Sequence, residues 1–88
     1  MKARTLLAWN LRRLRVERAL SQEKLAADAG VDRAYLGGLE RESENPTIDL
    51  LQRLAEALGA GVGEFFVEPP PGATKPQALP GGRRPKAS

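Results

Sequence analysis

One segment, residues 21–40 (SQEKLAADAGVDRAYLGGLE), constrains the fold most, because it predicts two short helices and a sharp turn. Ser21 and Asp32 are good N-caps for the two helices. Gly30 ends the first helix, since only glycine enters the left-handed conformation at little cost. Two helices of about two turns each, joined by so short a link, have to cross at a steep angle. The segment therefore predicts a helix-turn-helix, a motif whose second helix enters the DNA major groove.

Apolar spacing predicts three further helical segments. Leu7, Leu11 and Leu14 mark the buried stripe of a helix over residues 5–18. Thr47 is expected to cap a fourth helix that ends at Gly59, with an apolar face made of Ile48, Leu51, Leu54, Ala55 and Leu58. Residues 62–66 (VGEFF) predict a final short helix or turn. Because no strand pattern is present, we expect an all-α domain of five helices over residues 1–68, with the helix-turn-helix at 22–41.

Composition excludes most chemistry. The 88 residues contain neither cysteine nor histidine, which removes disulfides, thiolate zinc sites and the commonest general base. No spacing typical of paired catalytic carboxylates, a phosphate loop or metal ligands is found. No apolar run approaches the roughly 20 residues that span a bilayer, and no signal peptide is recognisable. We expect a cytoplasmic protein that is not an enzyme and has no cofactor, metal or membrane partner.

The positive charge belongs to one end of the chain. Residues 1–68 hold ten Lys and Arg against eleven Asp and Glu, whereas residues 69–88 hold four basic residues and no acidic one. The same end contains six of the seven prolines, so we expect a disordered tail over 69–88. It is either a solubilising end or a non-specific phosphate contact through Arg83, Arg84 and Lys86. Phosphate attraction in the folded part has to come from a local patch.

Six short motifs, in this order and spacing, resemble the Xre family, the small Cro- and lambda-repressor-like helix-turn-helix regulators. They are LRRLR at 11–15, SQEKLA at 21–26, AGV at 29–31, LE at 39–40, NPT at 45–47 and LAEALG at 54–59. The resemblance covers about residues 7–66. It implies a five-helix fold and binding to double-stranded operator DNA, usually as a homodimer.

The resemblance also implies roles for particular residues. Arg15 and Glu40 match positions that form a partly buried ion pair, which orients the fold rather than contacting DNA. Expected base contacts lie on the face opposite Leu36 and Leu39, at Arg33, Ala34, Gly37 and Gly38. Expected phosphate contacts are Gln22, Tyr35, Arg41 and Ser43. Two alternatives stay open: Arg33 could pair with Asp32 or solvent, and Tyr35 could simply pack on the helix surface.

Four positions depart from the family pattern. Gly37 and Gly38 each cost roughly 1 kcal/mol in helix propensity relative to alanine, and close approach of backbone to the bases is a possible benefit. Glu42 stands where the family often has glycine, so either this residue adopts a strained cap or the helix ends differently. Glu42 and Glu44 put negative charge into a loop that is commonly basic in the family.

Two other functions compete with an operator-binding regulator, which would be a repressor or autoregulator. An antitoxin-like or adaptor protein would bind mainly a protein, such as a polymerase or a toxin, and Leu6, Trp9, Val16 and Leu20 could supply that interface. Trp9 could instead cover the last helical segment. Non-specific nucleoid binding through the tail is the third possibility.

Overall fold

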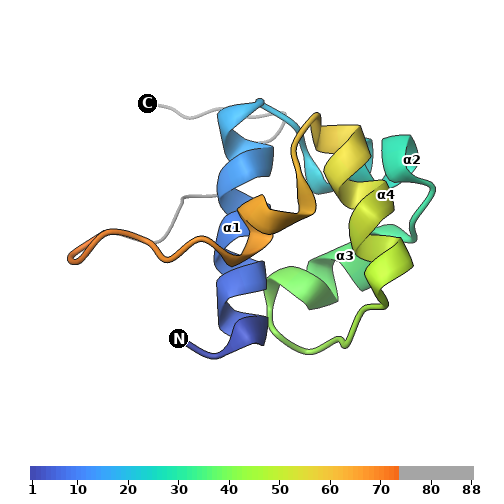
Figure 1. The fold of residues 1–88 in the computed structure, drawn as a ribbon. Helices are drawn as coiled ribbons and strands as arrows, with labels where there is room; N and C mark the ends of the chain where they lie inside the picture. The colour runs from blue at the N-terminus through green and yellow to red at the C-terminus, as the bar shows by residue number, and fades with distance from the viewer. Residues whose placement is uncertain (74–88) are drawn as a thin grey trace, which may run out of the picture.

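The computed structural model describes residues 1–73, and the basic part of the expected tail, from residue 74 onward, lies outside the described residues (Figure 1). The described part has no strand. It contains the elements α1 (Ala3–Glu17), α2 (Gln22–Ala29), α3 (Arg33–Glu40), α4 (Ile48–Leu58) and η1 (Val62–Phe66). Because η1 is a 3-10 helix of five residues, the described chain has four α-helices and not five. None of these helices is long and apolar enough to cross a membrane.

Side-chain caps begin three of the helices at the predicted residues. Ser21 Oγ accepts from Lys24 N at 3.0 Å, and Thr47 Oγ1 accepts from Leu50 N at 3.0 Å. Asp32 Oδ2 accepts from Tyr35 N at 3.1 Å. Each bond satisfies one backbone donor that has no partner within its own helix. The predicted starts of α2, α3 and α4 are therefore confirmed.

The core lies where all five elements meet, between α1 and α4. Leu11, Leu25, Leu36, Leu54 and Phe65 are completely buried there, so each element contributes at least one side chain. The prediction for the apolar face of α4 is wrong at its first residue. Ile48 is 79% exposed and lies outside the core cluster, whereas Leu51, Leu54 and Leu58 belong to it.

Asn10 fastens η1 to α1, and the sequence interpretation did not single it out. The side chain is 1% exposed, and its amide donates to Leu6 O at 3.0 Å, to Phe65 O at 3.0 Å and to Val67 O at 2.9 Å. Its oxygen accepts from Arg13 Nε at 3.1 Å. Buried polar groups are stable only with such partners. The available signal was a polar residue within the leucine-rich buried stripe of α1.

Two arginines hold α4 in place by capping helix ends. Arg18 Nε donates to Leu58 O at 2.6 Å, at the end of α4. Arg53, on α4, donates to Ala29 O at 3.2 Å and also to Gly30 O, at the end of α2. A cationic side chain at a helix C-terminus satisfies free carbonyls and interacts favourably with the helix dipole. The orientation of α2 is thus supported by α4.

Candidate nucleic-acid interface

The turn between α2 and α3 has the geometry that the sequence predicted. Gly30 has φ +70°, and Val31 N donates to Ala26 O at 2.8 Å. Ala26 is 2% exposed, which fits a small side chain at a close helix crossing. Leu36 and Leu39 on α3 are buried to 0% and 1% exposure, respectively. One side of α3 is thereby anchored in the core.

A buried ion pair connects α1 to the end of α3. Arg15 Nε lies 2.7 Å from Glu40 Oε2, and Arg15 Nη2 lies 3.0 Å from Glu40 Oε1. The two side chains are only 4% and 3% exposed. Arg15 Nη1 also donates to Leu20 O at 2.8 Å, in the link between α1 and α2. Both charges therefore have several partners, as burial requires, and the pair fixes the rotation of α3 about its own axis.

Gln22 lies between this buried pair and the surface. Its amide nitrogen donates to Glu40 Oε1 at 3.1 Å, so the acceptor Glu40 determines which way the amide points. Its oxygen then accepts from Arg33 Nη1 at 3.4 Å. Polar contacts thus run continuously from Arg15 in the interior to Arg33 outside.

The outward side of α3 differs along its length. Arg33 and Ala34, in the first turn, are exposed, and so is Arg41 just after the helix. Tyr35 is half-buried and packs against the core cluster. In docked helices of this type the amino-terminal residues reach base edges. Arg33 and Ala34 therefore occupy positions from which a base could be contacted, and Arg33 pairs with Gln22 rather than with Asp32.

Gly37 and Gly38, which the sequence predicted as base contacts, do not expose bare backbone, because neighbouring side chains lie over both. Both residues are buried. A Cβ on Gly37 would lie 3.0 Å from Arg41 Nη1 and 3.7 Å from Gln22 Oε1. A Cβ on Gly38 would lie 2.5 Å from Glu44 Cγ and 3.1 Å from Ser43 Oγ. Other side chains fill the space above both glycines, and at Gly38 that space admits no side chain of its own.

At the end of α3 the structure has the strained cap, which is one of the two alternatives that the sequence left open at Glu42. Glu42 has φ +65°, and the bonds from Glu42 N to Leu39 O (3.2 Å) and from Ser43 N to Gly38 O (2.8 Å) complete the helix end. The Glu42 carboxylate accepts from Thr5 Oγ1 at 2.7 Å, which ties the loop to α1. Ser43 Oγ donates to Gly38 O at 3.1 Å. The Ser43 hydroxyl therefore bonds to the helix end in this structure, and the phosphate contact predicted for it stays a prediction.

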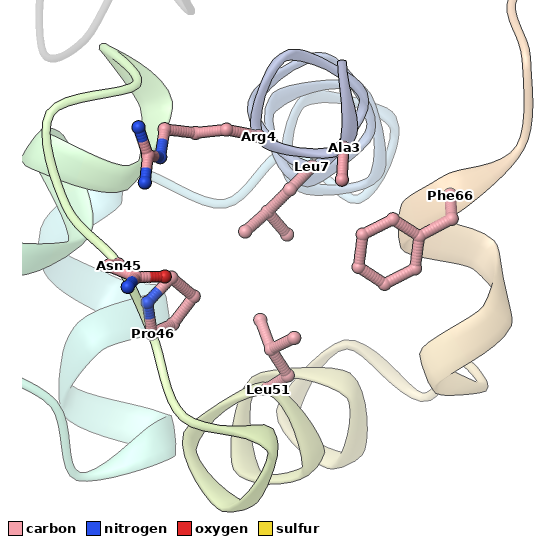
Figure 2. A pocket seen from close by; sticks show the side chains of 7 residues that line it. All are labelled: Ala3, Arg4, Leu7, Asn45, Pro46, Leu51 and Phe66. Carbon is pink, nitrogen blue, oxygen red and sulfur yellow. The ribbon is translucent and has the colours of Figure 1, made fainter. Parts of the chain in front are cut away.

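An apolar hollow of about 220 Å³ lies between α1, the loop before α4, and η1. In Figure 2 the side chains of Leu7 and Leu51 face each other across the hollow, and the Phe66 ring stands at one side. Seven residues line it: Ala3, Arg4, Leu7, Asn45, Pro46, Leu51 and Phe66. Phe66 is 39% exposed, and the exposed Ile48 is two residues from Pro46. Unpaired apolar surface is therefore concentrated beside the loop that follows α3.

The apolar residues of the first helical segment that were considered for a protein partner are mostly buried within the domain. Leu6 is 8% exposed, and Leu20 packs against the core cluster. Trp9 and Val16 remain half-buried, so neither side chain stands free on the surface. Most of the apolar area offered to a protein partner on α1 is thus used within the domain.

Comparison with known proteins decides the family. The helix-turn-helix family HTH_3 matches residues 11–65, which is most of the described chain and contains α2, α3 and α4. The protein belongs to this Xre-like helix-turn-helix family. Members of the family are DNA-binding transcriptional regulators, and no enzymatic family is indicated.

Three relatives illustrate the range of this family. A hypothetical transcription factor of Neisseria meningitidis is 36% identical over 66 residues, which are 75% of this chain and 62% of the relative. A solved structure of the factor NHTF from Neisseria has a TM-score of 0.74 at 35% identity and covers 77% of this chain and 78% of that chain. The HTH-type transcriptional regulator y4dJ of Sinorhizobium fredii is 46% identical over 59 residues, 67% of this chain and 77% of the relative.

The third relative is a restriction-modification controller, C.Esp1396I. Its tetramer was solved in complex with its natural 35 base-pair operator. That structure has a TM-score of 0.68 at 30% identity and covers 75% of this chain and 87% of the controller chain. The solved structures that resemble this chain therefore include one in complex with operator DNA.

Proposed function

We propose that this protein is a sequence-specific transcriptional regulator that binds an operator in double-stranded DNA as a homodimer. In this proposal α3 lies in the major groove and regulation follows from occupancy of a promoter, including its own. The observation that carries the proposal is that α3 has one side buried in the core and an exposed first turn on the other side. Leu36, Leu39 and Glu40 hold one side rigidly, while Arg33 and Ala34 at its start are left to solvent.

The contacts that we propose follow from side-chain chemistry. The Arg33 guanidinium can pair with guanine O6 and N7, and the Ala34 methyl can contact a thymine methyl group. Arg41, Tyr35 and the start of α2 at Gln22 would face the sugar-phosphate backbone. Gln22 has a second amide hydrogen beyond the one that it donates to Glu40, so it can bind a phosphate without breaking that bond.

Dimerisation is proposed through the hollow and Ile48. Ile48 is an exposed apolar knob, and the hollow lined by Leu7, Leu51 and Phe66 is an apolar hole whose rim includes Pro46, two residues before Ile48. A two-fold interface pairs a patch with itself, so a knob beside a hole is self-complementary. The knob and the hole both adjoin the loop after α3, which would place two copies of α3 side by side. One module of this size rarely makes enough contacts for tight specific binding alone.

Selection of preferred sites from a random duplex pool, followed by a salt titration, tests the function. A specific regulator is expected to bind its selected site about 10³-fold or more tightly than random DNA, with affinity falling steeply as salt rises. Equal affinity for selected and random duplexes, across the whole salt range, would contradict the proposal.

Sedimentation equilibrium of Ile48→Asp tests the dimer. Aspartate at the start of α4 suits the helix dipole, so the fold should persist while the knob is lost. Ile48→Leu, which keeps an apolar knob, is the matched control. We expect a weakened dimer for Ile48→Asp alone, together with weaker operator binding. An unchanged dimer in Ile48→Asp would rule out this interface while leaving DNA binding open.

A further inference from the structure

The loop after α3 places a carboxylate over the helix where a side chain of α3 itself is missing. Gly38 has no side chain, and a Cβ built there would lie 2.5 Å from Glu44 Cγ and 3.2 Å from Glu44 Oε2. Glu44 therefore occupies the direction in which residue 38 would project. The glycine is what makes this possible, because any larger residue would have to displace Glu44.

Gly38 belongs to the same stripe of α3 as Ala34, one helical turn earlier, since residues four apart share a helix face. Ala34 is exposed at the start of that stripe. A carboxylate above Gly38 thus extends the outward surface that begins at Arg33 and Ala34. Residue 38 itself contributes no side chain, and Glu44 fills the space that such a side chain would take.

The Glu44 carboxylate has lone pairs to spare. The side chain is half-buried, and within residues 1–73 it forms no ion pair and accepts no side-chain hydrogen bond. Glu42, two residues earlier, differs, because its carboxylate accepts from Thr5 Oγ1. An acid in this loop repels phosphate, so it lowers affinity for every duplex alike. A hydrogen bond with a base edge would offset that repulsion at one sequence only.

We propose that Glu44 is a specificity-determining residue that substitutes for the missing side chain at Gly38 and accepts a hydrogen bond from the N4 amino group of a cytosine. Among the bases, cytosine presents an amino donor in the major groove without the adjacent N7 acceptor that a purine carries. A carboxylate, which only accepts, matches that pattern. This inference rests on the proposed function, because it needs α3 in the major groove.

Site selection with the wild type, Glu44→Ala and Glu44→Gln tests the inference. For Glu44→Ala we expect the preference for cytosine to fall by about 5- to 150-fold at one position per half-site. Binding to random duplexes should rise in the same variant because a negative charge is removed. Glu44→Gln should shift the favoured base at that position towards adenine, whose N6 and N7 suit an amide.

Two further variants separate base recognition from charge. Glu42→Gln removes the same charge from the same loop and keeps an acceptor for Thr5, so it should raise affinity for all duplexes without changing any preferred base. Gly38→Ala keeps the charge and displaces Glu44, so it should weaken the preference at the same position as Glu44→Ala.

The two proposals fail in different ways. If Glu44→Ala and Glu44→Gln select the same base as the wild type at every position, Glu44 does not read DNA and the inference is overturned, while the regulator function stands. If the wild type selects no sequence, the proposed function is overturned and the inference with it.

Discussion

The two sides of α3 are built on different principles. On the inner side, Leu36, Leu39 and Glu40 are at most 5% exposed, and each has partners from other helices. On the outer side, the side chains of Arg33 and Ala34 make a single hydrogen bond, the long one from Arg33 to Gln22. The inner side determines where the helix lies, and the outer side is free to determine what it contacts. Stability and recognition are therefore separable within eight residues.

The largest expected effect is on the inner side, at the buried ion pair. Glu40→Ala would leave the Arg15 guanidinium buried without its carboxylate, and such losses typically cost about 3–5 kcal/mol of unfolding free energy. Urea denaturation followed by circular dichroism measures it. Replacing both partners by methionine is the control, and it should recover most of the loss. A loss below 1 kcal/mol in Glu40→Ala would show that the pair is not what holds α3.

The next effect belongs to the outer side and to recognition alone. Arg33→Ala should reduce discrimination at one base pair of each half-site by about 1–3 kcal/mol. Its unfolding free energy should stay within about 0.5 kcal/mol of the wild type, as for exposed positions generally. Competition binding with single-base variants of the selected site, alongside urea denaturation, measures both. An unchanged site preference would remove Arg33 from the base-reading set.

Gln22 touches both sides, so it tests how far they are separate. Gln22→Ala removes a bond to Glu40 and the proposed phosphate contact, each worth about 1 kcal/mol. We expect affinity to fall alike for selected and random duplexes, with a small loss of stability. If the preferred base at the Arg33 position changes instead, the two sides are coupled through Gln22. Fluorescence anisotropy with both kinds of duplex distinguishes these results.

The smallest effect compares the two glycines. Gly37→Ala gains helix propensity of up to about 1 kcal/mol, and only the flexible end of Arg41 has to move. Gly38→Ala gains the same propensity but meets Glu44 Cγ at 2.5 Å, so its net stabilisation should be smaller or absent. Thermal unfolding of both variants provides the comparison. Equal stabilisation of the two variants would mean that Glu44 can move away from residue 38 without any loss of unfolding free energy.

Local signals in the sequence predicted the helix-turn-helix correctly. The helix caps contact only groups a few residues away in the chain, so their roles can be predicted without knowing the fold. These caps are Ser21, Asp32, Thr47 and Gly30. At Glu42 the sequence left two helix ends open, and the structure has the one with a positive φ.

What the sequence could not show depends on contacts between distant segments. Whether Ile48 is covered depends on where α4 begins relative to its neighbours. Whether Gly38 is covered depends on the path of the loop to Glu44. The buried bonds of Asn10 join residues more than fifty positions apart. The DNA contacts themselves remain predictions for all the residues proposed above.

Arg53 has a practical consequence for protein engineering. Its guanidinium, contributed by α4, donates to Ala29 O and Gly30 O, where α2 gives way to the turn. Residues 21–41 transplanted into another scaffold would arrive without that donor, and these two carbonyls would be left to water. A graft of the motif should therefore carry an arginine at the equivalent place, because the motif is not self-sufficient.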